Sequence, residues 1–118
     1  MGFLDRFRQE RPPAPDLDLV ILRQLRGKGA QLALPRHVLH FLDFSDEASA
    51  TSAEEAVREI GFEPTIVAPT GESLTWTLRA EANRVVDETT VVTHRAQFER
   101  IAAAHGGEYD GWEAAAAP

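Results

Sequence analysis

Hydrophobic and polar positions follow two different periods along this chain. Apolar side chains repeat every three to four residues in 16–26 and 52–60, and this spacing predicts helices. Asp16 is the expected N-cap of the first helix and Gly27 its stop. Its apolar stripe consists of Leu17, Val20, Ile21 and Leu25.

The second helix is expected to begin at Ser52, because Glu55 follows three residues later in a capping-box pattern. The small, polar stretch 45–51 is then a loop, and Gly61 ends the helix in a left-handed conformation. Its expected buried face consists of Ala53, Ala56, Val57 and Ile60. A third helix is expected to begin near 87–90 and to end near His105, with Phe98, Ile101 and Ala102 on its apolar stripe.

Four other stretches read as strands: 36–44, 62–68, 74–82 and 108–114. In 74–82 the apolar residues, from Leu74 to Ala82, alternate with polar ones, so this strand is expected to have one buried and one wet face. Pro64 has no backbone N–H to donate, so the strand that contains it is expected at a sheet edge or at a bulge.

The order of these elements predicts an α+β fold. After the first helix the pattern is βαββαβ, which is typical of ferredoxin-like folds: a four-stranded antiparallel sheet with two helices on one face. The N-terminal helix is an addition to that scaffold. We expect a folded domain over 16–114 and a tail over 115–118.

The first fifteen residues are expected to be a flexible segment and a proline-rich linker, because Pro12, Pro13 and Pro15 favour extended backbone. Phe3, Leu4 and Phe7 fall at helical spacing. We expect a frayed tail or a segment folded back on the domain, and the alternative is a short helix that docks on a membrane surface or a partner.

Charge is unevenly distributed. The net charge is −7, but residues 1–35 carry +2 and residues 36–118 carry −9. Such a domain repels phosphate backbones and anionic lipid, so we expect no direct nucleic-acid binding and no stable membrane insertion. A basic protein partner is the ligand that this charge favours, although excess acids also serve solubility alone.

No residue pattern indicates catalysis. The sequence has no cysteine, so thiol chemistry and cysteine-ligated metals are excluded. His37 and His40 point to opposite faces of a strand, and His94 and His105 lie roughly 16 Å apart along a helix, so neither pair chelates a metal locally. Nor is there a nucleophile elbow or a phosphate-binding glycine loop. We expect a protein that is not an enzyme and holds no metal or cofactor.

Glu108-Tyr109-Asp110-Gly111-Trp112 is the most distinctive motif. Glycine inside a strand indicates a bulge or a close backbone approach. In a regular strand Tyr109 and Trp112 point to opposite faces, one in the core and one at the surface. The interpretation as a shaped strand with a core tryptophan is favoured over an aromatic contact surface.

At this motif the sequence resembles the regulator of ribonuclease activity B (RraB) family, whose members inhibit ribonuclease E. The first helix, the strand 36–44 and the segment 54–63 also agree, so the resemblance covers about residues 16–113. It implies a ferredoxin-like domain that binds the endonuclease in the cytoplasm without a cofactor. The better-known members carry a long acidic C-terminal extension, and the segment Glu113–Pro118 departs from that pattern with a single acid.

The leading hypothesis is therefore a non-enzymatic regulator that binds the basic, RNA-binding segments of a ribonuclease. The expected partner-binding residues are Glu54, Glu55, Glu59, Glu63, Tyr109, Asp110 and Trp112. The alternative is a small acidic interaction domain, similar to an immunity protein, that neutralises another basic protein. A ligand-binding or enzymatic ferredoxin-like domain is a third hypothesis, and a homodimer paired through sheet edges stays open.

Overall fold

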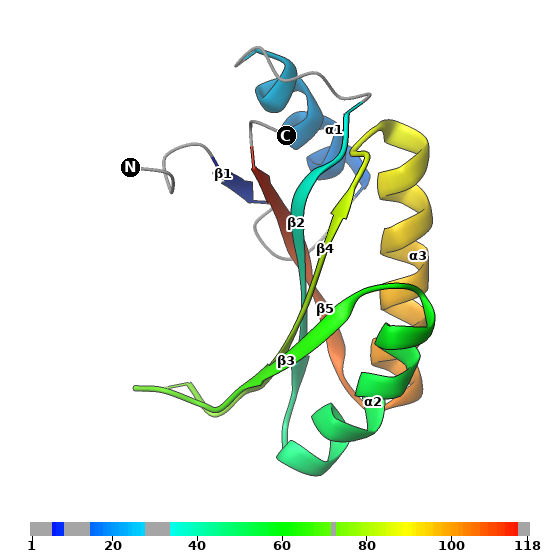
Figure 1. Ribbon diagram of the computed structural model, residues 1–118. Helices are drawn as coiled ribbons and strands as arrows, with labels where there is room; N and C mark the ends of the chain where they lie inside the picture. Colours follow the sequence, from blue (N-terminus) through cyan, green and yellow to red (C-terminus); the bar gives the residue numbers. More distant parts are fainter. Residues whose placement is uncertain (1–5, 9–14, 28–33, 72, 116–118) are drawn as a thin grey trace.

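In the computed structural model, residues 6–8, 15–27, 34–71 and 73–115 are described here. Within these residues the chain forms three helices and one five-stranded sheet (Figure 1). The elements in chain order are β1 (Arg6–Arg8), α1 (Pro15–Gly27), β2 (Arg36–Phe44), α2 (Glu47–Glu59), β3 (Glu63–Val67), β4 (Trp76–Arg84), α3 (Glu88–Ala104) and β5 (Glu108–Ala115).

The sheet has the order β1-β5-β2-β4-β3, and every neighbouring pair is antiparallel. Its four longer strands have the arrangement expected of a ferredoxin-like βαββαβ fold, so the predicted fold class is confirmed. Pro64 lies in β3 at the edge, as its missing N–H predicts. The addition is β1, which pairs with β5 from Arg6 opposite Ala115 to Arg8 opposite Glu113.

Part of the N-terminal segment is thus folded back on the domain as a strand. The helical docking alternative is wrong for Phe7, which lies opposite Ala114 in β1. Phe3, Leu4 and the prolines at 12 and 13 lie outside the described residues.

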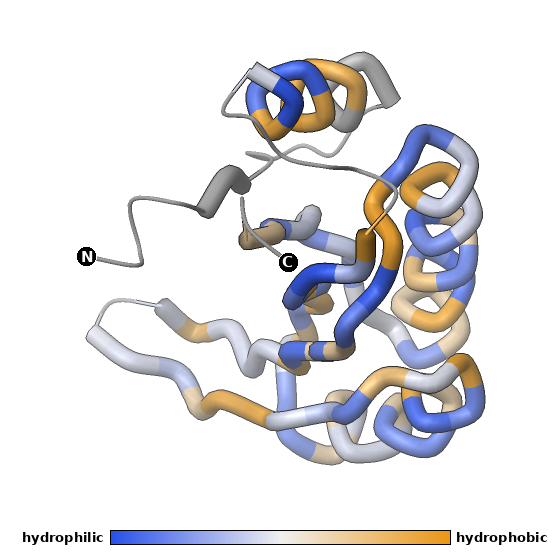
Figure 2. The backbone as a smooth tube through the Cα atoms, turned by 45° about the horizontal axis from the view of Figure 1, so that its top comes forward, coloured by the Kyte–Doolittle hydropathy of each residue, from blue (hydrophilic) through white to orange (hydrophobic). Residues whose placement is uncertain are grey.

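All three helices pack against one face of the sheet. In Figure 1 α2 lies beside the lower part of the sheet and α3 runs from there up to the level of α1, and the two helices cover a core cluster that includes Leu42, Phe62 and Phe98. α1 covers the upper end and buries Ile21, Leu22 and Leu25 against Val38, Trp112 and their neighbours. Figure 2 shows the resulting alternation of hydrophobic and hydrophilic positions around the helix turns.

The start of α2 was predicted wrongly. The helix begins at Glu47, and Asp46 is the N-cap, whose carboxylate accepts a hydrogen bond from the backbone N–H of Ser49 at 2.7 Å. Ser52 lies inside the helix and is not its cap. Gly61 ends α2 with φ = +87°, as predicted. α1 similarly begins at Pro15, one residue before the expected cap Asp16.

β4 begins two residues later than expected. Leu74 precedes the strand and is 85% exposed, so its assignment to the buried face is wrong. On the opposite face of β4 Thr77 and Arg79 are half-buried, so that face is less wet than the alternation predicted.

Candidate protein-binding surface

The outer side of α2 is acidic. The helix carries four glutamates and one basic residue, Arg58. Glu55 is 76% exposed and Glu54 25% exposed, and both lie about 4 Å from the Arg58 guanidinium. Exposed pairs at this distance contribute little and leave the helix with a net negative surface.

Glu59 and Glu63 continue this surface. Glu59 is exposed in the last turn of α2, one turn after Glu55 on the same side of the helix. Glu63 is exposed in the first position of β3, opposite Glu81 of β4. The four glutamates predicted to bind a partner therefore lie along one helix and the strand that follows it.

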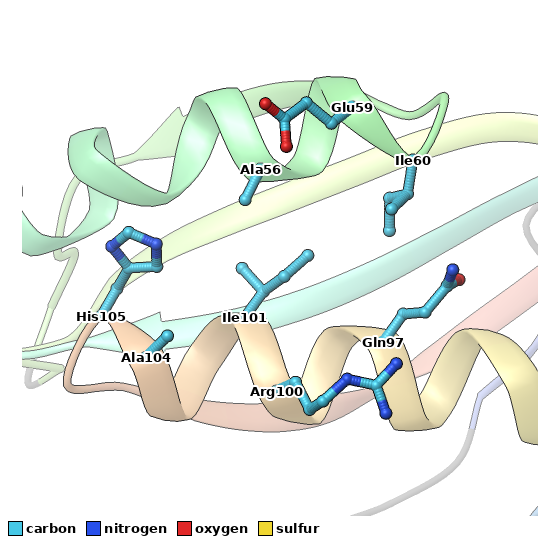
Figure 3. Close-up of a pocket in the computed structure, with 8 residues that line it drawn as sticks. All are labelled: Ala56, Glu59, Ile60, Gln97, Arg100, Ile101, Ala104 and His105. Carbon is cyan, nitrogen blue, oxygen red and sulfur yellow. The ribbon is translucent and has the colours of Figure 1, made fainter.

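A groove of about 290 Å³ separates α2 from α3 (Figure 3). Ile101 projects from α3 toward Ala56 of α2, and Ile60 points down into the same space. The groove exists because the facing positions Ala56 and Ala104 are small. Its lining consists of Ala56, Glu59, Ile60, Gln97, Arg100, Ile101, Ala104 and His105.

A hydrogen bond joins α2 and α3 beside one end of the groove. The Ser52 hydroxyl donates to the Ser49 carbonyl at 2.7 Å and lies 2.8 Å from Nδ1 of His105. Because a hydroxyl has one hydrogen, Nδ1 of His105 is the donor in the second bond. This bond ties the middle of α2 to the C-terminal end of α3.

Two opposite charges line the groove without neutralising each other. Glu59 belongs to the α2 wall and Arg100 to the α3 wall. Within the described residues, neither the Glu59 carboxylate nor the Arg100 guanidinium has an ion pair or a side-chain hydrogen bond. Both remain available to a partner.

The motif Tyr109–Trp112 forms a β-bulge. Leu42 of β2 lies opposite Tyr109 and His40 lies opposite Trp112, so Asp110 and Gly111 together oppose Phe41. Gly111 has φ = +97°, a conformation that glycine adopts readily. The expected bulge is present, but the expectation that Tyr109 and Trp112 face opposite sides is wrong, because the extra residue turns both to the helix-covered face.

Both aromatic side chains of the motif are core residues. Trp112 is 1% exposed and Tyr109 is buried, so neither offers a surface anchor to a partner. Asp110 is also buried, on the other face of the sheet, and lines a second hollow with Phe41, Asp43 and Arg79. The structure therefore separates the motif from the acidic surface of α2.

A buried histidine organises the aromatic core. Nδ1 of His40 lies 2.7 Å from the Tyr109 hydroxyl, and its ring stacks on Phe98 with centroids 4.4 Å apart. The His94 ring lies edge-on at 5.8 Å. Burial holds the pKa of His40 well below its ordinary value, with smaller contributions from the nearby His94 and Arg95 charges. His40 is thus a neutral packing residue that does not line any of the grooves described above.

The groove residues were not identified as a site from the sequence. Ile60 and Ile101 were expected on buried faces and are half-buried at the groove floor. Two signals point there in retrospect: the run Ala102–Ala104 and the small Ala56 on the facing helix. Among the described residues, no group of three or more metal-binding side chains is close enough to hold a metal ion, and none of the described helices is long and apolar enough to cross a bilayer.

Most of the chain matches a known protein family. Residues 17–114 match the model of the family described as Regulator of ribonuclease activity B. The matched range runs from α1 to β5 and includes the groove, while β1 precedes it. In a comparison with curated proteins, nothing matched.

Proposed function

The chain belongs to the regulator of ribonuclease activity B family, and from this membership we propose that it binds a ribonuclease and lowers its activity on RNA. The match over residues 17–114 is the observation that carries the proposal. The partner that the sequence resemblance indicates is ribonuclease E, in the cytoplasm. The chain acts by binding and performs no chemistry of its own.

The charge distribution supports a protein partner with basic segments. Residues 36–118 carry a net charge of −9, and three of the four glutamates of α2 are exposed on a helix with one basic residue. A ribonuclease binds RNA through Lys and Arg, which an acidic surface attracts at long range. The chain then competes with RNA for the same segments. Its own charge disfavours direct RNA binding.

A binding and cleavage experiment tests this function. Purified chain is immobilised and presented with ribonuclease E, and cleavage of an RNA substrate is measured with and without the chain as salt rises. We expect binding and inhibition at low ionic strength, both weakening as salt screens the charges. Absence of binding in dilute buffer contradicts the proposal.

A matched pair of variants locates the surface. Glu55→Gln/Glu59→Gln removes two charges from α2, and Glu88→Gln/Glu108→Gln removes two exposed charges elsewhere. The first variant is expected to bind ribonuclease E more weakly and the second to bind like the native chain. Equal weakening would show that only net charge matters, and not the surface of α2.

A further inference from the structure

We infer that the groove between α2 and α3 binds an amphipathic helix of the partner protein, with basic residues along the side that meets Glu55 and Glu59. This inference rests on the proposed function, which supplies the partner, and adds the part of the partner that is bound. It names a recognition mode and a site that are testable separately from ribonuclease inhibition.

The floor of the groove suits the apolar stripe of a helix. Ile60 and Ile101 are half-buried and leave apolar surface in contact with solvent, while Ala56 and Ala104 keep the space between the helices open (Figure 3). Apolar residues at i, i+4 and i+7 of a docking helix fill such a groove.

The walls decide between a helix and an extended peptide. An extended peptide that binds as an added strand gains its affinity from backbone hydrogen bonds to a sheet edge. The walls here are the α2 and α3 helices, whose backbone groups are already bonded within each helix. These walls offer no backbone groups to an added strand, which favours an occupant that satisfies its own backbone groups, as a helix does.

The charges on the two walls define the flanks of the occupant. Glu59 lies on the α2 wall, with Glu55 beside the groove one turn earlier in the same helix, and Gln97 and Arg100 lie on the α3 wall. Glu59 and Arg100 lack ion partners among the described residues. The helix that complements them carries Lys or Arg on one flank and an acidic or amide side chain on the other.

The net charge favours a foreign helix over a second copy of this chain. Two copies would each carry a net charge of −7 and would repel each other. A basic segment is instead attracted, which increases its rate of association at low salt.

A peptide titration tests the groove directly. The probe is a designed helical peptide of roughly 15 residues with a leucine stripe, lysines on one flank and glutamates on the other, added to the ¹⁵N-labelled full chain. We expect the largest chemical-shift changes at Ile60, Ile101 and Ala104. Changes centred elsewhere, or equal changes with a peptide of the same composition and a scrambled stripe, overturn the inference.

Variants tested against ribonuclease E give a second readout. Ala104→Gln places a longer, neutral side chain in the groove, and Ala103→Gln makes the same change at an exposed neighbour outside the lining. We expect the first to weaken binding roughly tenfold and the second to leave it unchanged, with urea unfolding as the check that both are folded. Glu59→Arg and Glu108→Arg form a matched pair for charge, with weakening expected only for the first.

The outcomes separate the two proposals. If the native chain does not bind ribonuclease E, the proposed function fails, and the peptide titration still decides whether the groove binds a helix. If the native chain binds and Ala104→Gln binds equally well, the groove inference fails and the function stands. A native dimer in sedimentation that Ala104→Gln dissociates assigns the groove to a second copy and also overturns the inference.

Discussion

At the residue scale, Gly111 links a local backbone conformation to the composition of the core. Its φ of +97° allows the bulge that turns Tyr109 and Trp112 to the same face of the sheet. The Tyr109 hydroxyl then reaches Nδ1 of His40, and Trp112 packs beneath α1. The conformation of Gly111 therefore places Tyr109 in one core cluster and Trp112 in the other.

Replacing Gly111 should destabilise the fold. In Gly111→Ala the new residue carries a Cβ atom. The positive-φ backbone conformation at this position costs about 1–3 kcal/mol for residues other than glycine. The free energy of unfolding from urea denaturation measures this loss. Gly27→Ala is the control, because a Cβ atom there has nothing within 4 Å and the backbone is not in the positive-φ region. Equal stability of both variants would contradict this role of the bulge.

Stability should fall as the pH drops below about 6.5, the ordinary pKa of histidine. Burial lowers the pKa of His40 and, less strongly, that of His94 in the folded chain. Below that pH the unfolded chain takes up protons that the folded chain does not, so the free energy of unfolding decreases by up to about 1.4 kcal/mol per pH unit and per histidine. The cap residues Asp46 and Asp87, whose pKa values are lowered by backbone hydrogen bonds, act only in a lower window, as the pH falls below 3.8.

Urea denaturation between pH 8 and pH 5 measures this dependence. The double variant His40→Phe/Tyr109→Phe removes both partners of the buried hydrogen bond, so neither is left unsatisfied. It should show a shallower loss of stability with falling pH. An unchanged slope would show that His40 is not the group responsible.

At the element scale, α1 is an integral part of the domain. Leu25 is fully buried in the cluster that also holds Val38, Val91 and Trp112, and α1 packs against α3. α2 lies at the opposite end of the sheet, so at this end α1 covers the sheet together with the first turn of α3.

Leu25→Ala should therefore cost about 2–5 kcal/mol, as truncations of buried leucines do. Val20→Ala, on the exposed side of the same helix, should change stability by less than about 0.5 kcal/mol. Thermal or urea unfolding of the two variants checks this. A small effect of Leu25→Ala would mean that α1 is only loosely attached.

Local patterns predicted most elements, and the errors have physical causes. β2 and β5 were predicted nearly to the residue, because apolar runs bounded by glycine and proline are local signals. The start of α2 was missed because Asp46 and Ser52 are both plausible caps. The buried Ala50, three residues before Ala53, is the position that decides for Asp46.

The candidate site was predicted only in part. The exposed glutamates of α2 follow from helical spacing, but the groove depends on how α3 lies across α2. Helical spacing alone predicts that Ile60 and Ile101 are core residues. They are only half-buried because the small side chains of Ala56 and Ala104 leave space between the two helices. Likewise a glycine indicates a bulge, while the face to which Tyr109 turns depends on its register with β2.

At the scale of the whole molecule, salt should shift stability and partner binding in opposite directions. The net charge is −7, and the excess negative side chains repel one another in the folded chain. Salt screens this repulsion, so it is expected to stabilise the domain modestly. The same screening weakens attraction to a basic partner. Urea denaturation and ribonuclease binding, both measured at about 0.1 M and about 1 M NaCl, check the two trends, and a parallel response would contradict the electrostatic account of binding.

The position of β5 between β1 and β2 also constrains how the chain folds as it is synthesised. The sheet pairs residue 6 with residue 115. The edge of β2 that pairs with β5 has no partner strand until β5 has been synthesised. Contacts between such distant residues form slowly, because a long loop must close first. Of the five strands in this sheet β5 is synthesised last, and its pairing completes the sheet and adds Trp112 to the core. We expect nascent chains halted before Glu108 to remain sensitive to protease and released full-length chains to become resistant.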